Sequence, residues 1–70
     1  MVVVTFHTTQ EAFAFEAAAA SAFLPGKLGV TPRSLSADCG FSWQAPDECK
    51  ADLEILIADA RLTCAGVHMI

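Results

Sequence analysis

The sequence predicts an α+β domain of the ferredoxin-like class, with the element order β-α-β-β-α-β. Four short runs rich in β-branched or aromatic residues are interleaved with two longer segments whose apolar residues recur at helical spacing. Right-handed crossovers then place both helices on one face of a four-stranded antiparallel sheet. A chain of 70 residues is long enough for one such domain, so we expect a single domain over residues 1–70.

The first strand and the first helix are predicted on either side of Thr8. The segment "VVVTFH" (2–7) is a β-branched run with little alternation, as in a strand that is buried on both faces. Thr8 suits the N-cap of the helix, because Glu11 follows three residues later and the two can form a capping box. Pro25-Gly26 ends this helix. Its apolar stripe is predicted to consist of Phe13, Ala17, Ala20 and Leu24.

Two further strands are predicted between the helices. "KLGVTP" (27–32) indicates a short strand that Pro32 ends or confines to an edge, because proline has no N–H for a ladder. In "GFSWQ" (40–44), Phe41 and Trp43 alternate with polar residues, which is typical of a half-buried strand. The apolar face of that strand needs a cover, and the second helix is expected to provide it.

The second helix is predicted to begin at Pro46. Asp47 and Glu48 follow it and favour the positive end of the helix dipole. "TCAGVHMI" (63–70) is the last predicted strand. The apolar stripe of this helix is predicted to consist of Cys49, Leu53, Leu56, Ile57 and Ala60.

No element remains to cover the other face of the sheet, so that face is either polar or paired with another subunit. The composition is 54% hydrophobic, which is rich for a chain of 70 residues. Domains of this size bury a small fraction of their surface and gain stability from association. We therefore expect self-association, most simply as a two-fold homodimer.

Charge and hydropathy exclude several classes of protein. The net charge is −4 and the four basic residues are scattered, so we expect no nucleic-acid partner. The longest apolar stretch contains Glu16 and is too short to span a bilayer, and the N-terminal segment lacks the basic region of a signal peptide. We expect a cytoplasmic protein that does not bind membranes.

The three cysteines form no CxxC pair, so neither a disulfide framework nor a zinc site is expected. No cofactor-binding motif is present either. Cys39 stands out because Ser34, Ser36 and Asp38 precede it, which predicts a thiol close to water. The alternative is a structural thiol. Cys49 on the helix stripe is expected in the core, and Cys64 is expected to be structural.

The stretches "TFHTT" and "PRSLSADCG" carry a resemblance to a small bacterial family described as putative selenium/sulfur carrier protein-like. The similarity extends over nearly the whole chain. Two groups of residues match the family pattern. They are Thr5, Phe6, His7 and Thr8 at the end of the first strand, and Pro32, Arg33, Leu35, Ser36, Cys39 and Gly40 before the third. Asp38 departs from the pattern, in which small neutral residues are usual.

The resemblance implies that Cys39 carries sulfur or selenium as a persulfide or selenopersulfide. Arg33 is then expected to lower the pKa of this thiol, and Asp38 to raise it. His7 is either a proton acceptor or a residue bonded to the backbone. Ser36 and Gly40 belong to the binding part of the motif. Nothing indicates an enzyme beyond a carrier or transferase-type thiol protein.

The partners implied are a donor of the cysteine desulfurase type and an acceptor protein. The alternative function is an interaction or regulatory module. Such a module would use the open face of the sheet, and Cys39 would be incidental.

Overall fold

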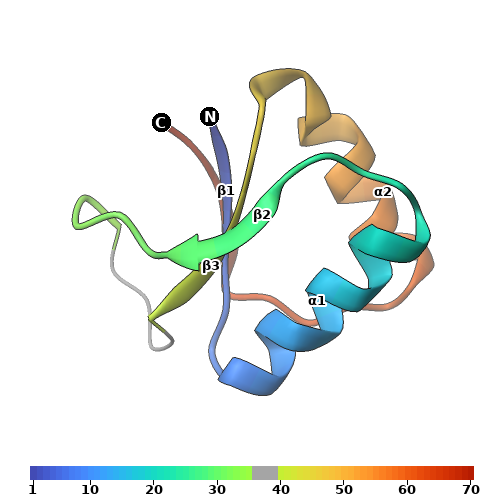
Figure 1. Cartoon of the computed structure of the whole chain (residues 1–70), viewed down its shortest axis with the longest axis horizontal. Coiled ribbons are helices and arrows are strands. Elements are labelled where there is room, and N and C mark those ends of the chain that lie inside the picture. Colours follow the sequence, from blue (N-terminus) through green and yellow to red (C-terminus); the bar gives the residue numbers. More distant parts are fainter. Residues whose placement is uncertain (36–39) are drawn as a thin grey trace.

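The sheet of this protein has the strand order β2-β3-β1-β4 and is antiparallel throughout. The computed structural model describes residues 1–35 and 40–70. In chain order the elements are β1 (Val2–Thr5), α1 (Thr9–Ser21), β2 (Lys27–Val30), β3 (Phe41–Ala45), the 3-10 helix η1 (Asp47–Cys49), α2 (Lys50–Asp59) and β4 (Gly66–Met69). Both helices lie on the same side of the sheet (Figure 1). This arrangement confirms the predicted ferredoxin-like fold.

Helix α1 begins where the sequence predicts. Thr8 has the extended backbone of an N-cap (φ −136°), and its hydroxyl accepts a hydrogen bond from the Glu11 N–H at 3.2 Å. The Glu11 carboxylate reaches one residue further back than in a capping box, and it accepts from the backbone N–H of His7 at 2.7 Å. The first turn of the helix therefore ties the end of β1 to α1.

The face that α1 buries differs from the predicted stripe. Phe15 is fully buried, with its ring centroid 5.4 Å from that of Phe6 and 5.8 Å from that of Trp43. Phe13, by contrast, is 54% exposed. The buried residues of α1 are Ala12, Phe15 and Ala19, so the stripe built on Phe13, Ala17 and Ala20 was wrong. Leu24 of that stripe does pack, partly buried, against the core.

The second helix follows the prediction more closely. Cys49 and Leu53 are buried in the core, and Leu56 and Ile57 pack against it, while Ala60 is exposed. Pro46 precedes η1, and the α-helix itself starts at Lys50. Asp47 and Glu48 thus lie in a 3-10 turn, which enters the helix through Cys49.

The face of the sheet opposite the helices is polar. The Gln44 amide lies across the sheet and donates to the Val30 carbonyl at 2.7 Å and to the Ser42 hydroxyl at 3.3 Å. On the other edge, the His68 imidazole lies 3.2 Å from the Thr5 hydroxyl. Ser42 and Thr5 are buried beneath these two side chains. The face that the helices leave uncovered therefore carries polar side chains, which is one of the two possibilities that the sequence left open. Self-association stays a prediction.

Two glycines let Gln44 and His68 lie flat on the sheet. A Cβ at Gly29 would stand 3.3 Å from the Gln44 amide nitrogen, and one at Gly66 would stand 3.0 Å from His68 Nε2. Gly29, Ser42, Thr5 and Gly66 form one row across the four strands. The side chains of Gln44 and His68 therefore extend from the neighbouring row and pack over this row of small residues.

Candidate thiol site

The segment that carries the cysteine motif begins and ends at one point of the sheet. The Thr31 N–H donates to the Gly40 carbonyl at 2.9 Å, directly beyond the last pair of β2 and β3. Residues 32–39 connect these two bonded residues. Cys39 and Ser36 lie outside the described residues, but Cys39 is joined by one peptide bond to Gly40. The covalent chain therefore ties the motif cysteine to this end of the sheet.

Gly40 is exposed and has open space beside it. A Cβ built at this residue meets no atom of the described chain within 4 Å. The predicted place of Gly40 in the binding part of the motif stays a prediction.

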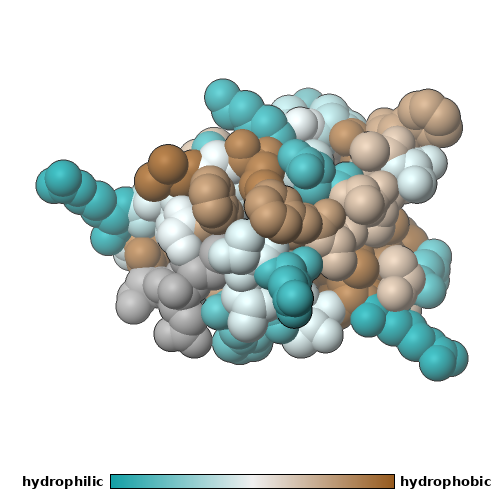
Figure 2. All heavy atoms as spheres, turned by 60° about the horizontal axis from the view of Figure 1, so that its bottom comes forward, coloured by the Kyte–Doolittle hydropathy of each residue, from teal (hydrophilic) through white to brown (hydrophobic). Residues whose placement is uncertain are grey.

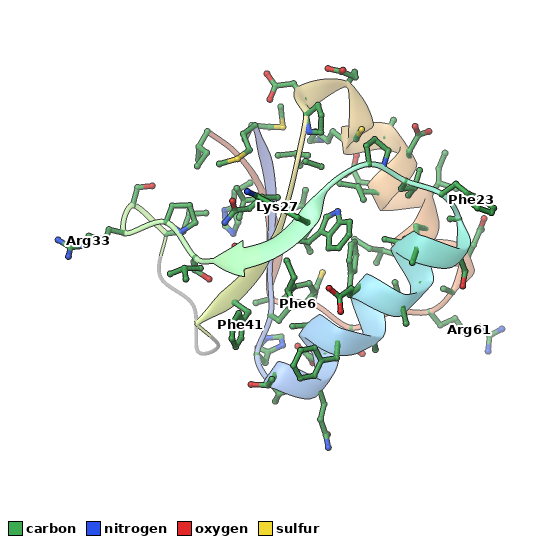
Figure 3. The ribbon with its side chains drawn as sticks, in the orientation of Figure 1. Phe6, Phe23, Lys27, Arg33, Phe41 and Arg61 are labelled. Atoms are coloured by element: carbon green, nitrogen blue, oxygen red, sulfur yellow. The ribbon has the colours of Figure 1, made fainter. Side chains whose placement is uncertain are left out.

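Arg33 lies in a turn that the Leu35 N–H closes by donating to the Pro32 carbonyl at 3.0 Å. Its side chain is exposed and extends away from the sheet (Figure 3). Within residues 1–35 and 40–70 it forms no ion pair. Its predicted role as the cation beside Cys39 therefore stays a prediction.

His7 lies at the same end of the sheet as Gly40. The register of β1 and β3 ends with the pair Thr5 and Ser42, and both His7 and Gly40 are two positions beyond that pair. On the other side of β1, Thr5 is paired with Gly66, so Cys64 is also two positions beyond the last pair. The strand ends thus bring His7, Gly40 and Cys64 to one edge.

The imidazole of His7 is hydrogen-bonded to Glu11, with Nδ1 3.2 Å from Oε1 and 3.4 Å from Oε2. A carboxylate only accepts, so Nδ1 carries the proton in the neutral ring and Nε2 is left with a lone pair. The side chain of His7 is half exposed. The sequence prediction treated Glu11 only as a capping residue. The i, i+4 spacing of His7 and Glu11 across the helix start was the signal for this pair.

The other two thiols are held in or against the core. Burial raises the pKa of Cys49, and the carboxylates of Glu48 and Asp52 raise it further. Partial burial also raises the pKa of Cys64, with an additional contribution from Glu11. Both cysteines are free thiols. Each is expected to be protonated at neutral pH, in agreement with their predicted structural roles.

An open pocket of the described chain lies away from this end of the sheet. It has a volume of 610 Å³, and its lining includes Met1, Lys27, Gln44 and Asp47. These residues flank the opposite ends of the strands from Gly40. A smaller hollow of 410 Å³ lies beside Glu11, between the start of α1 and residues 61–63. We favour the end of the sheet near Gly40 as the site because His7 of one motif and Gly40 of the other both lie there.

Residues 1–35 and 40–70 contain no group of three or more metal-ligating side chains placed to hold a metal ion. No helix in that part of the chain has the length and apolar character needed to cross a membrane. The fold is that of a small ferredoxin-like domain, and its sequence carries a cysteine directly before Gly40. The family described as putative Se/S carrier protein-like matches the chain over residues 1–69, and the chain belongs to this family. No curated protein and no solved structure matches it.

Proposed function

We propose that this protein is a sulfur or selenium carrier that holds the transferred atom on Cys39. The family to which the chain belongs is named for such a carrier. The observation that best supports Cys39 as the carrier thiol is the full or partial burial of the other two cysteines, Cys49 and Cys64. Cys49 is buried in the core and Cys64 packs against it, and the pKa of each thiol is raised. The cysteine of the motif is the remaining thiol.

The proposed loading step is a thiol exchange. The Cys39 thiol gives its proton to His7 Nε2, and the resulting thiolate attacks the outer sulfur of a persulfide, R–S–S–H. The S–S bond of the donor breaks and a new S–S bond forms on Cys39. The donor leaves as the thiolate R–S⁻, so no oxidant or reductant is consumed. An outer selenium atom would follow the same path and give a selenopersulfide.

The hydrogen bond between His7 and Glu11 supports the role of His7 in this step. A carboxylate that accepts from Nδ1 fixes the tautomer with its lone pair on Nε2. The donor in this scheme is a protein of the cysteine desulfurase type, and the acceptor attacks the same outer atom in turn. We place this exchange in the cytoplasm, where cysteines stay reduced.

Mass spectrometry of sulfur loading tests the proposal. Wild-type protein treated with inorganic polysulfide should gain the mass of one sulfur atom on Cys39, and Cys39→Ser should gain none there. Cys64→Ser is the matched control, because it removes a thiol at the same edge, and it should load as wild type does. If Cys39→Ser gains as much sulfur as wild type, the carrier function is refuted. The alternative of an interaction module with an incidental Cys39 would then replace it.

A further inference from the structure

An exposed aromatic pair lies beside the end of the sheet that carries Gly40. The rings of Phe13 on α1 and Phe41 on β3 are in contact, with centroids 6.5 Å apart and an interplanar angle of 36°. Phe13 is 54% exposed and Phe41 is 42% exposed. Val30, the cross-strand neighbour of Phe41, is 78% exposed. We call these three side chains the aromatic patch.

The aromatic patch extends the core to the surface at the end where α1 no longer covers the sheet. The face that comes forward in Figure 2 shows apolar side chains gathered there. The other aromatic pairs, Phe6 with Phe15 and Phe15 with Trp43, are buried. Phenylalanine is among the residues enriched at protein–protein interfaces relative to the rest of the surface.

The position of the patch relates it to the carrier thiol. Phe41 follows Gly40 directly, so it is two residues from Cys39 in the chain. Sulfur passes between two proteins only when their sulfur atoms come within bonding distance. A protein that exchanges sulfur with Cys39 must therefore cover the surface next to Gly40. We propose, resting on the carrier function above, that the aromatic patch is the docking surface of the protein that donates sulfur to Cys39.

The size of the patch favours a transient partner over a stable second copy. A phenylalanine side chain can bury about 150–250 Å², so two rings about half exposed present on the order of 200 Å². A stable interface takes about 800 Å² from each partner. A carrier must release its donor after each transfer, and a small aromatic anchor suits such a contact.

The charge of the chain favours a donor that is basic around its docking surface. The sequence has eight acidic and four basic residues, giving a net charge of −4, so two copies repel one another. Glu16 is exposed one turn of α1 beyond Phe13. The occupant we infer is thus a persulfide-bearing protein with an apolar side chain framed by lysine or arginine residues.

Phe13→Ser tests the docking surface, and Phe23→Ser is its control. Phe23 is 93% exposed and lies at the other end of the molecule from Phe41 (Figure 3). Each variant is loaded from a purified cysteine desulfurase in its persulfide form and, separately, from inorganic polysulfide. Phe13→Ser should slow loading from the desulfurase at least roughly tenfold, as removal of an aromatic anchor does, and leave loading from polysulfide unchanged. Phe23→Ser should change neither rate. Higher ionic strength should slow only the desulfurase reaction.

The remaining outcomes of these loading experiments distinguish the docking proposal from the proposed carrier function. Loading of wild type by polysulfide but not by the desulfurase would refute the docking proposal and leave the carrier function intact. Loading by neither would refute the carrier function itself. Equal desulfurase rates for Phe13→Ser and wild type would show that the patch is not the docking surface. A concentration-dependent dimer in sedimentation that Phe13→Ser abolishes would identify a second copy as the occupant, and would overturn the proposal.

Discussion

The imidazole of His7 and the carboxylate of Glu11 face each other across the first turn of α1, with Nδ1 3.2 Å from Oε1. The same carboxylate accepts from the backbone N–H of His7 at 2.7 Å. It also raises the pKa of the Cys64 thiol, after the larger effect of burial. One side chain thus links the start of a helix, a histidine and a cysteine.

Glu11→Gln should lower the pKa of Cys64. The substitution removes the negative charge that disfavours the thiolate, while the amide oxygen can still accept from the His7 N–H and keep the helix start. The pH dependence of Cys64 alkylation measures this shift. Glu16→Gln, on the same helix, is the control and should leave the pKa of Cys64 unchanged. An unchanged pKa in Glu11→Gln would show that burial alone causes the rise.

The three cysteines should differ in their reaction with iodoacetamide at neutral pH. Cys39 should be alkylated first, because Cys49 is buried and Cys64 is partly buried, and the pKa of each of these two thiols is raised. Labelling of Cys49 and Cys64 in the native protein should still be increasing when the pH passes their ordinary pKa of 9.0. Peptide mass spectrometry after a short exposure gives the order. Earlier labelling of Cys49 or Cys64 would contradict the choice of Cys39.

Gly26→Ala should destabilise the fold far more than Gly40→Ala. Gly26 has φ +136°, and a Cβ there would stand 2.6 Å from the indole nitrogen of Trp43 and 2.9 Å from the Gln44 carbonyl oxygen. The strain and the clash together should cost about 2–4 kcal/mol of the free energy of unfolding.

At Gly40 the added methyl group meets nothing within 4 Å, so the free energy of unfolding should stay unchanged or rise by up to about 1 kcal/mol. Urea denaturation of both variants measures the difference. Similar losses in the two would mean that the close packing around Gly26 relaxes at little cost.

Phe15→Ala and Phe13→Ala should separate the buried face of α1 from its exposed face. Phe15 is fully buried between two aromatic rings, and its removal should cost about 3–5 kcal/mol. A chain of 70 residues has a total stability of roughly 4–10 kcal/mol, so this variant should be close to unfolded. Phe13→Ala should lose less than about 1 kcal/mol. Thermal unfolding followed by circular dichroism compares them, and the reverse order would restore the stripe predicted from sequence.

The order of the elements could be predicted because each carries a local signal. The β-branched run at the start, the Thr8 cap and the alternation around Trp43 are properties of a few neighbouring residues. The orientation of α1 could not be predicted in this way. Most positions of that helix are alanine or phenylalanine, so more than one apolar stripe fits the sequence. The contact of Phe15 with Phe6 and Trp43, which are distant in sequence, selects one of them.

Only part of the candidate site could be predicted from the sequence. The motif located Cys39, Arg33 and His7 in the sequence, and the strand order brings His7 and Gly40 to one edge. The bond between the His7 ring and Glu11 was missed, because the capping rule assigns Glu11 to the backbone of Thr8. The polar cover formed by Gln44 and His68 was also missed, since it depends on the register that places Gln44 beside Gly29 of β2, and on Gly66, two residues before His68 in β4.

The hydrogen bond from Thr31 to Gly40 joins the two ends of the motif segment, so the segment is attached to the sheet at a single place. Its two attachment points lie directly beyond the last pair of β2 and β3, so the pairing of these strands sets where the segment begins and ends. The length of a connecting segment also has a small effect on stability, because doubling the number of residues in a loop raises the free energy of loop closure by only about 0.6 kcal/mol. Evolution could therefore exchange the chemistry carried between these two residues, in length as well as in composition, while the scaffold that presents it is inherited intact.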